Sequence, residues 1–298
     1  MSDVSKQRIL IMEGNPRERR ERTLELGIRT SSAIYAEAIH AHFPELDIDV
    51  IYGADPDASL PENRKLSDYA GFVVSGSALH AYDTDFAVTN QIDILRQAAN
   101  VGLPILGSCW GLQIAAVAAG GEVSYHPKGR EVGIGRTIIV NPAGRAHPML
   151  RARGAAFDAP CIHYDEVTRL PDTATLLASN AHSNVQAAII PLGKTKIWAV
   201  QYHPEFDLRH LADLYALYAD DMIAQGFFAN KVVLERYCND VMTLHKEPDN
   251  FGLAWQLGVD EAIINDTDRR SEIIAWVASE VYGREAMKGL NGQRPSAK

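Results

Sequence analysis

Residues 104–113 read PILGSCWGLQ: a short apolar run, a turn with a glycine on each side of Ser108-Cys109-Trp110, and the start of a helix-forming segment. So tight a turn places its central residue in an unfavourable backbone conformation, which Gly107 and Gly111 permit because they have no Cβ. Cys109 is then presented at the amino end of a helix, where the dipole and free N–H groups favour the thiolate. The motif predicts a strand, a sharp turn and a helix with either a nucleophilic or a small buried cysteine at the corner.

The alternation of strand and helix patterns continues on both sides of this stretch. Short apolar runs predict strands at 9–12, 48–52, 72–74 and 104–106. Helical patterns begin at residue 30 and cover 86–100 and 111–119. Strands separated by helices indicate an α/β fold, a doubly wound and mainly parallel sheet with flanking helices. Further β-rich segments, some of them antiparallel, are expected to extend or flank that sheet at 133–140, 174–178, 185–190 and 197–202.

From residue 208 onward the apolar spacing becomes helical again, which predicts a helical C-terminal extension. This extension could support a dimer or a partner, or cover one face of the sheet, and we favour the last. Residues 293–298 are expected to be disordered. The segment 15–29, rich in Arg and Glu, follows the first strand, where open α/β sheets bind ligands. It is expected to be a solvated loop, a lid or a docking surface.

Composition restricts the function classes. The chain has 298 residues and a formal net charge of −9, which gives no electrostatic attraction for nucleic acid. Three cysteines, Cys109, Cys161 and Cys238, lack the spacing of a disulfide framework or a zinc site. Residues 1–6 lack the apolar region of a signal peptide, and no stretch has the length of a membrane helix. These features predict a cytoplasmic protein without a nucleic-acid or membrane partner.

A catalytic thiol needs a base, and the base needs an orienting group. His203-Pro204-Glu205 follows the predicted strand at 197–202, so His203 should emerge from the sheet at a strand end. If the chain stays extended through Pro204, His203 and Glu205 project to the same side, within reach of a carboxylate–imidazole hydrogen bond. We therefore expect Cys109, His203 and Glu205 to form a catalytic triad.

These two motifs resemble those of the class I, or triad, glutamine amidotransferase domain. Residues 107–113 are similar to its Gly-x-Cys-aromatic-Gly-x-Gln elbow and residues 203–205 to its His-Pro-Glu, at a similar separation of 94 residues. The resemblance covers 7–224 and leaves 225–298 as the helical extension. Among subgroups, residues 161–167 are most similar to the Ser-His-Gly-Asp-x-Val stretch of the GMP synthetase glutaminase domain.

The resemblance also implies further site residues. Gly76 lies where the family keeps a Gly-Gly loop, so its backbone N–H and that of Trp110 would form the oxyanion hole. Ser75 departs from the family's usual glycine, which makes the loop conformation the open point. Gln113 and the backbone near Gly76 would contact bound glutamine, and His163 and Asp165 would line the pocket or form a polar turn between two strands. No metal or cofactor is implied, and Cys161 and Cys238 are taken as structural.

The expected reaction is hydrolysis of the γ-amide of glutamine through a cysteinyl thioester, which releases ammonia for an acceptor or a separate synthase subunit. The sequence contains no fused synthetase, so the acceptor would lie on another chain. A free-standing γ-glutamyl hydrolase or peptidase would use the same thioester on a larger γ-glutamyl compound. A catalytically silent binding or regulatory module is the third alternative, and the intact Cys109, His203 and Glu205 argue against it.

Overall fold

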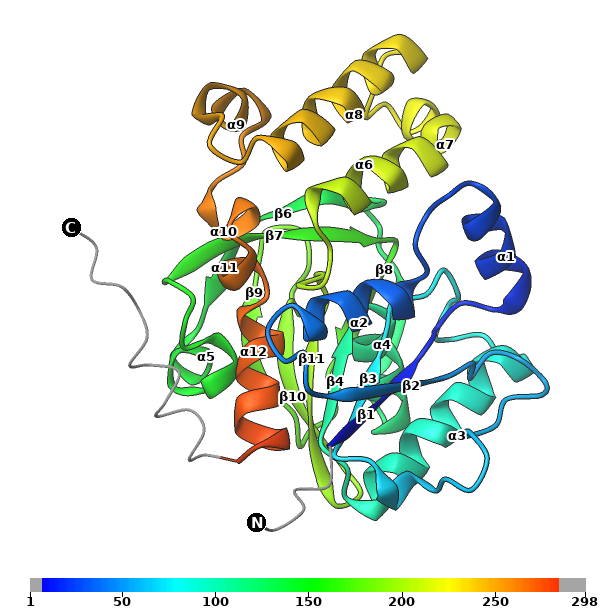
Figure 1. Ribbon diagram of the computed structural model, residues 1–298. Coiled ribbons are helices and arrows are strands. Elements are labelled where there is room, and N and C mark those ends of the chain that lie inside the picture. The colour runs from blue at the N-terminus through cyan, green and yellow to red at the C-terminus, as the bar shows by residue number, and fades with distance from the viewer. Residues whose placement is uncertain (1–6, 284–298) are drawn as a thin grey trace.

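Within residues 7–283, the part of the chain that the computed structural model describes, a nine-stranded sheet forms the centre of the molecule (Figure 1). The expectations for residues 1–6 and 293–298 lie outside this part. The strand order is β2-β1-β3-β4-β11-β10-β9-β6-β7, and β5 and β8 form a separate antiparallel pair. The strands are β1 (Arg8–Met12), β2 (Asp47–Ile51), β3 (Gly71–Val74), β4 (Ile105–Ser108), β5 (Glu122–Tyr125), β6 (Glu131–Val140), β7 (Ala156–His163), β8 (Asp165–Arg169), β9 (Thr175–Ser179), β10 (Ala187–Leu192) and β11 (Thr195–Val200).

The sheet has a parallel half and an antiparallel half. Neighbours from β2 through β11 run parallel, whereas those from β11 through β7 run antiparallel. In register, Ser108 of β4 lies opposite Val200 of β11. The carboxyl ends of β4 and β11 therefore meet, although their sequences lie about a third of the chain apart. This pairing carries the residues after each strand to one place.

Helices cover both faces of the sheet and extend beyond it (Figure 1). The helices are α1 (Arg17–Glu25), α2 (Ser31–His40), η1 (Leu66–Asp68), α3 (Phe86–Val101), α4 (Trp110–Ala118), α5 (Pro142–Ala146), η2 (Pro148–Leu150), α6 (Leu208–Leu217), α7 (Ala219–Ala224), α8 (Lys231–Lys246), α9 (Phe251–Leu257), α10 (Glu261–Ile264), α11 (Asp266–Arg269), α12 (Ser271–Trp276) and η3 (Val277–Val281). Apolar residues of α2 and α12 pack on one face of the sheet, and those of α3 and α4 pack on the other. Such two-sided cover is what buried parallel strands require.

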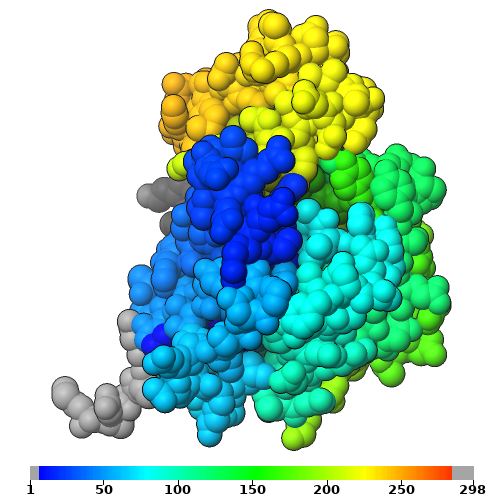
Figure 2. Space-filling view, turned by 90° about the vertical axis from the view of Figure 1, so that its right-hand side faces the viewer, coloured from blue at the N-terminus to red at the C-terminus, as the bar shows by residue number. Residues whose placement is uncertain are grey.

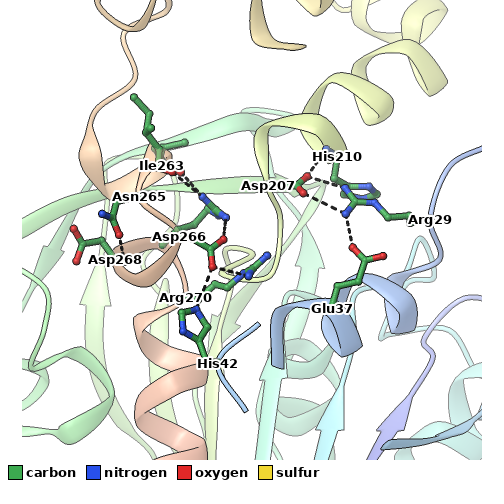
Figure 3. A network of polar contacts seen from close by, with 12 residues as sticks. Arg29, Glu37, His42, Asp207, His210, Ile263, Asn265, Asp266, Asp268 and Arg270 are labelled. Carbon is green, nitrogen blue, oxygen red and sulfur yellow. Dashed lines mark hydrogen bonds and ion pairs between the residues drawn. The ribbon is translucent and has the colours of Figure 1, made fainter. Parts of the chain in front are cut away.

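The C-terminal helices leave the sheet and return to it. Helices α6, α8 and α9 form a third apolar cluster above the antiparallel half, and α12 then inserts Trp276, fully buried, beside α2. Ion pairs join these C-terminal segments to the region around α2 at two places (Figure 3). Asp266 contacts His42 at 3.1 Å and Arg270 at 2.7 Å, and Asp207 at the start of α6 contacts Arg29 at 2.7 Å. The extension thus covers one face of the sheet.

The fold class and the C-terminal helices predicted from the sequence are confirmed. The apolar patterns did not predict β5, β7 and β8. Strand β5 buries a single residue, Pro160 interrupts the apolar pattern of β7, and charged residues follow in β8. The expected loop at 15–29 contains α1, whose composition of Arg and Glu gives no apolar period and which buries none of its side chains. No helix among residues 7–283 is long and apolar enough to cross a membrane.

Candidate active site

The turn between β4 and α4 presents Cys109 in a strained conformation. Its φ is +51° and its ψ −97°, a combination that an L-residue adopts only where the surrounding structure enforces it. The Cys109 N–H donates to the Val200 carbonyl at 2.8 Å, which ties the turn to β11. A Cβ on Gly107 would lie 2.8 Å from the carbonyl carbon of Gly111, so the crossing of strand and helix requires glycine. The sulfur is held at the carboxyl edge of the sheet as the motif predicted.

His203 and Glu205 lie directly behind this thiol. The Nδ1 atom of His203 is 2.7 Å from a carboxylate oxygen of Glu205, and both side chains are almost fully buried. Ser108 donates its hydroxyl to the same oxygen at 3.0 Å and so fixes the carboxylate from the elbow side. The Phe206 ring stacks on the imidazole with centroids 3.8 Å apart and an interplanar angle of 5°. These contacts fix the plane of the His203 ring and leave Nε2 without a hydrogen-bond partner among residues 7–283.

The environment raises the pKa of His203. Burial disfavours the charged ring, but the Glu205 carboxylate and contact with the Cys109 thiol outweigh it and raise the pKa to about 10. His203 is therefore protonated at neutral pH. A protonated imidazole can deliver a proton to a leaving group.

The loop after β3 approaches the site through Gly76. A Cβ at this position would lie 2.8 Å from Cε1 of His203, so a larger residue would displace the ring. Ser75, the departure from the family pattern, accepts a hydrogen bond from Gly14 N–H at 3.0 Å and donates to the Gly76 carbonyl at 3.3 Å. Its hydroxyl thus fixes the loop. The Trp110 indole donates to Gln91 at 2.9 Å, which fixes the residue after Cys109 as well.

A cavity of about 410 Å³ opens in front of the thiol. The residues predicted for the site that line it are Gly76, Cys109, Gln113, His163, Asp165 and His203. Glu205 and Trp110 are buried behind them. The structure thus brings all eight together, in a single cavity and the layer directly beneath it.

The predicted pocket residues are held by protein atoms. Gln113 donates to the Asp165 carbonyl at 3.1 Å. His163 lies with Nδ1 at 2.9 Å from the same carbonyl and Nε2 at 2.9 Å from the Glu131 carboxylate, while the Asp165 side chain contacts His80 at 2.7 Å. His163 and Asp165 are the last residue of β7 and the first of β8, the polar turn that the sequence left as an alternative. Their contacts hold this turn at the cavity wall.

Four further residues are the two other cysteines and two residues of the site whose contacts the sequence did not predict. Burial raises the pKa of the Cys161 thiol well above its ordinary value and that of Cys238 to about 11, so neither is a reactive thiolate. The sequence did not predict the contacts of Ser108 with Glu205 and of Phe206 with His203. Each residue adjoins a motif residue in the chain, and this position was the one sequence feature that could have indicated its role. Among residues 7–283, no group of His, Cys, Asp and Glu is arranged to hold a metal ion.

The fold and this site define a class of protein, and comparison with known proteins identifies it. The family model described as "Glutamine amidotransferase class-I" matches residues 32–215. The chain belongs to this family. The matched range contains Cys109, His203 and Glu205.

Individual relatives include hydrolases. The chain is similar to a gamma-glutamyl-L-1-hydroxyisopropylamide hydrolase of Pseudomonas sp, with 33% identity over 68% of this chain and 68% of the relative. It is 32% identical to gamma-glutamyl peptidase 4 of Arabidopsis thaliana over 60% of this chain and 72% of that relative. It is also 32% identical to one subunit of the glutamine-hydrolyzing GMP synthase of Methanoregula boonei, over 56% and 80%. Among solved structures, a glutamine amidotransferase from Thermotoga maritima shares the fold with a TM-score of 0.61, at 18% identity over 87% of this chain and 99% of that chain.

Proposed function

We propose that this chain hydrolyses a γ-glutamyl amide through a cysteinyl thioester on Cys109. The thiolate attacks the γ-carbonyl carbon, and the negative charge on the oxygen is stabilised by the N–H groups of Gly76 and Trp110. Protonated His203, oriented by Glu205, gives its proton to the nitrogen as the C–N bond breaks and the amine leaves. Neutral His203 then takes a proton from water as the resulting hydroxide attacks the thioester carbon. The C–S bond breaks to release the thiolate and the γ-carboxylic acid, which gives its proton to solvent.

One observation carries this proposal: the strained Cys109 and the buried His203–Glu205 pair, which contact at 2.7 Å, meet at the wall of one cavity. A structural cysteine needs neither a positive φ nor an imidazole whose Nε2 lacks another partner in the described part of the chain. The arrangement matches the requirements of a thiol nucleophile with a proton donor and an orienting carboxylate. It argues against a catalytically silent module.

A substrate larger than glutamine fits the site better. The cavity of about 410 Å³ lies in the range of sites that enclose drug-sized ligands, about 300–1,000 Å³. Relatives at 33% and 32% identity are a γ-glutamyl-hydroxyisopropylamide hydrolase and a γ-glutamyl peptidase. We therefore rank hydrolysis of a γ-glutamyl peptide or amine first. Glutamine hydrolysis with transfer of ammonia to a separate synthase is the second candidate, supported by the GMP synthase relative.

Turnover assays separate these candidates. Purified protein is incubated with glutamine, a γ-glutamyl amine and a γ-glutamyl peptide, and glutamate, ammonia and amine are measured for wild type and Cys109→Ala. Cys161→Ala, a substitution at a buried thiol outside the cavity, is the matched control. Release of the amine from the larger substrates, lost in Cys109→Ala alone, supports the first candidate. Turnover restricted to glutamine supports the second, and no turnover together with no alkylation of Cys109 by a glutamine-like electrophile overturns both.

A further inference from the structure

Two arginines that the proposed chemistry does not use meet at the rim of the catalytic cavity. Arg19 of α1 and Arg130, directly before β6, both line it, and both guanidinium groups lie over the ring of Tyr218, at 5.1 and 4.9 Å from its centroid. Figure 2 shows α1, in blue, against the yellow segment of the C-terminal helices. Arg19 also contacts the Tyr218 hydroxyl. The two like charges thus share one aromatic ring.

Within residues 7–283 these two guanidinium groups share a single ion pair with a carboxylate, that of Arg130 with Asp221. Arg130 has a side chain 1% exposed, and its nearest carboxylate, at 3.6 Å, belongs to the half-exposed Asp221. Its other contacts are the Met222 sulfur at 3.9 Å and the face of Tyr164 at 3.8 Å, and its Nε has no partner among the described residues. Burial lowers the pKa of Arg130, and the charge of Arg19 lowers it further. Two guanidinium groups held together with so little negative charge indicate an anionic ligand.

The positions of these residues in the chain indicate which part of the ligand is anionic. The family match covers 32–215 and includes Cys109 and His203, which the proposed function assigns to the γ-glutamyl amide. Arg19 and Tyr218 lie outside that range, on segments of this chain beyond the matched region. Arg130 lies within the matched range, but it meets Arg19 over the Tyr218 ring. Because Arg19 and Tyr218 lie outside the region that the family shares, we expect this group to contact the part of the substrate that varies among relatives. The variable part is the amine.

We propose that Arg19 and Arg130 bind a carboxylate on the amine portion of the substrate, so that the enzyme prefers γ-glutamyl amino acids and peptides to uncharged γ-glutamyl amines. This inference rests on the proposed function. Arg19, half-exposed on α1, meets the carboxylate first, and Arg130 supplies the desolvated charge behind it. A charge-assisted hydrogen bond of this kind corresponds to a preference of about 10- to 100-fold in kcat/KM.

Two substrates that differ by one charge provide the test: γ-glutamylglycine and γ-glutamylglycinamide. Wild type should prefer the first at least about tenfold, and Arg19→Met and Arg130→Met should each bring the ratio of kcat/KM close to one. Arg22→Met is the control, because Arg22 is exposed on the same helix and does not line the cavity. Thermal melts show whether each variant is folded, and Arg19→Met is the safer variant because α1 buries no side chain.

Several results would overturn the inference. The first is equal kcat/KM of wild type for both substrates, and the second is a ratio of kcat/KM that both arginine variants retain. The third is an equal fall of kcat/KM for both substrates in the variants, which would assign the two arginines to the γ-glutamyl group. If wild type turns over neither substrate, the proposed function fails first. Binding of the two compounds to Cys109→Ala, measured by calorimetry, then decides the inference alone. A preference for γ-glutamylglycine that Arg19→Met removes supports it, and equal or absent binding refutes it.

Discussion

Replacing Glu205 by glutamine tests the electrostatic basis of the site. The carboxylate is fully buried, lies 2.7 Å from Nδ1 of His203, and is the main group that raises the pKa of that ring to about 10. The amide of Glu205→Gln keeps the shape and removes the charge. Because burial lowers the pKa of His203 and only the contact with Cys109 remains to raise it, the pKa in the variant should fall toward its ordinary value of about 6.5.

The size of the effect follows from these two values. At pH 8 a ring with a pKa of about 10 is protonated in roughly 99% of molecules, and one with a pKa of about 6.5 in roughly 3%. The supply of the proton donor therefore falls about 30-fold at this pH. Loss of orientation adds to it, because general acid catalysis by a positioned side chain contributes about 10²- to 10⁴-fold. We expect kcat/KM at pH 8 to fall at least about 100-fold.

The assay is the dependence of kcat/KM on pH for a γ-glutamyl amide. Wild type should retain activity up to an alkaline limb near pH 10, since protonated His203 is lost as the pH rises through its raised pKa. In Glu205→Gln this limb should move below about pH 7. Glu62→Gln removes an exposed carboxylate and is the control. An unchanged alkaline limb in Glu205→Gln, or a loss of less than about threefold, would refute the assignment of Glu205 as the group that charges His203.

Three further substitutions test the loop, the acid stability and the packing. Gly76→Ala, whose Cβ would lie 2.8 Å from the His203 ring, should lower kcat/KM about 100-fold with little change in Tm. Burial lowers the pKa of His210 to about 3, so as the pH falls below about 6.5 the unfolded state binds a proton on this ring before the folded state does, and the free energy of unfolding decreases. Urea unfolding of wild type should show a decrease of this free energy between pH 6 and pH 5 that is about 1 kcal/mol larger than the decrease in His210→Asn. Trp276→Ala should cost about 3–5 kcal/mol in urea unfolding, and a loss below about 1 kcal/mol would contradict its packing against the sheet.

The sequence predicted the central parallel strands β1, β3 and β4 because they are buried on both faces and read as mostly apolar runs. Residues 9–12 and 72–74 are examples, and both lie in strands with every residue from these runs fully buried. Edge and antiparallel strands expose one face, so β7 and β8 carry a weaker pattern. Helix α1 could not be predicted from apolar periodicity, since ion pairs of Arg17 and Arg20 with Asp55 hold it in place.

The residues of the proposed triad could be named from the sequence because each chemical demand is met within a few consecutive residues: glycines around Cys109, and an extended His203-Pro204-Glu205. Cys109 and His203 lie close together only because β11 pairs with β4 in the observed register, and a single sequence does not specify that pairing. Ser108, which donates to Glu205, was not predicted, because its role exists only once those two strands are neighbours. The division of the chain at residue 224 stays a prediction.

Helix α1 can change with less effect on the fold than the turn around Cys109 can. A change at Gly107 or Gly111 forces backbone atoms together and disturbs the crossing of strand and helix that presents Cys109. Helix α1 buries no side chain, so a change at Arg19 leaves the apolar clusters intact while it alters the charge at the cavity rim. The rim can therefore vary among proteins that keep the same chemistry. Substrate preference should accordingly follow the segments that border the cavity, and in this chain α1 is one that can change without disturbing the apolar clusters.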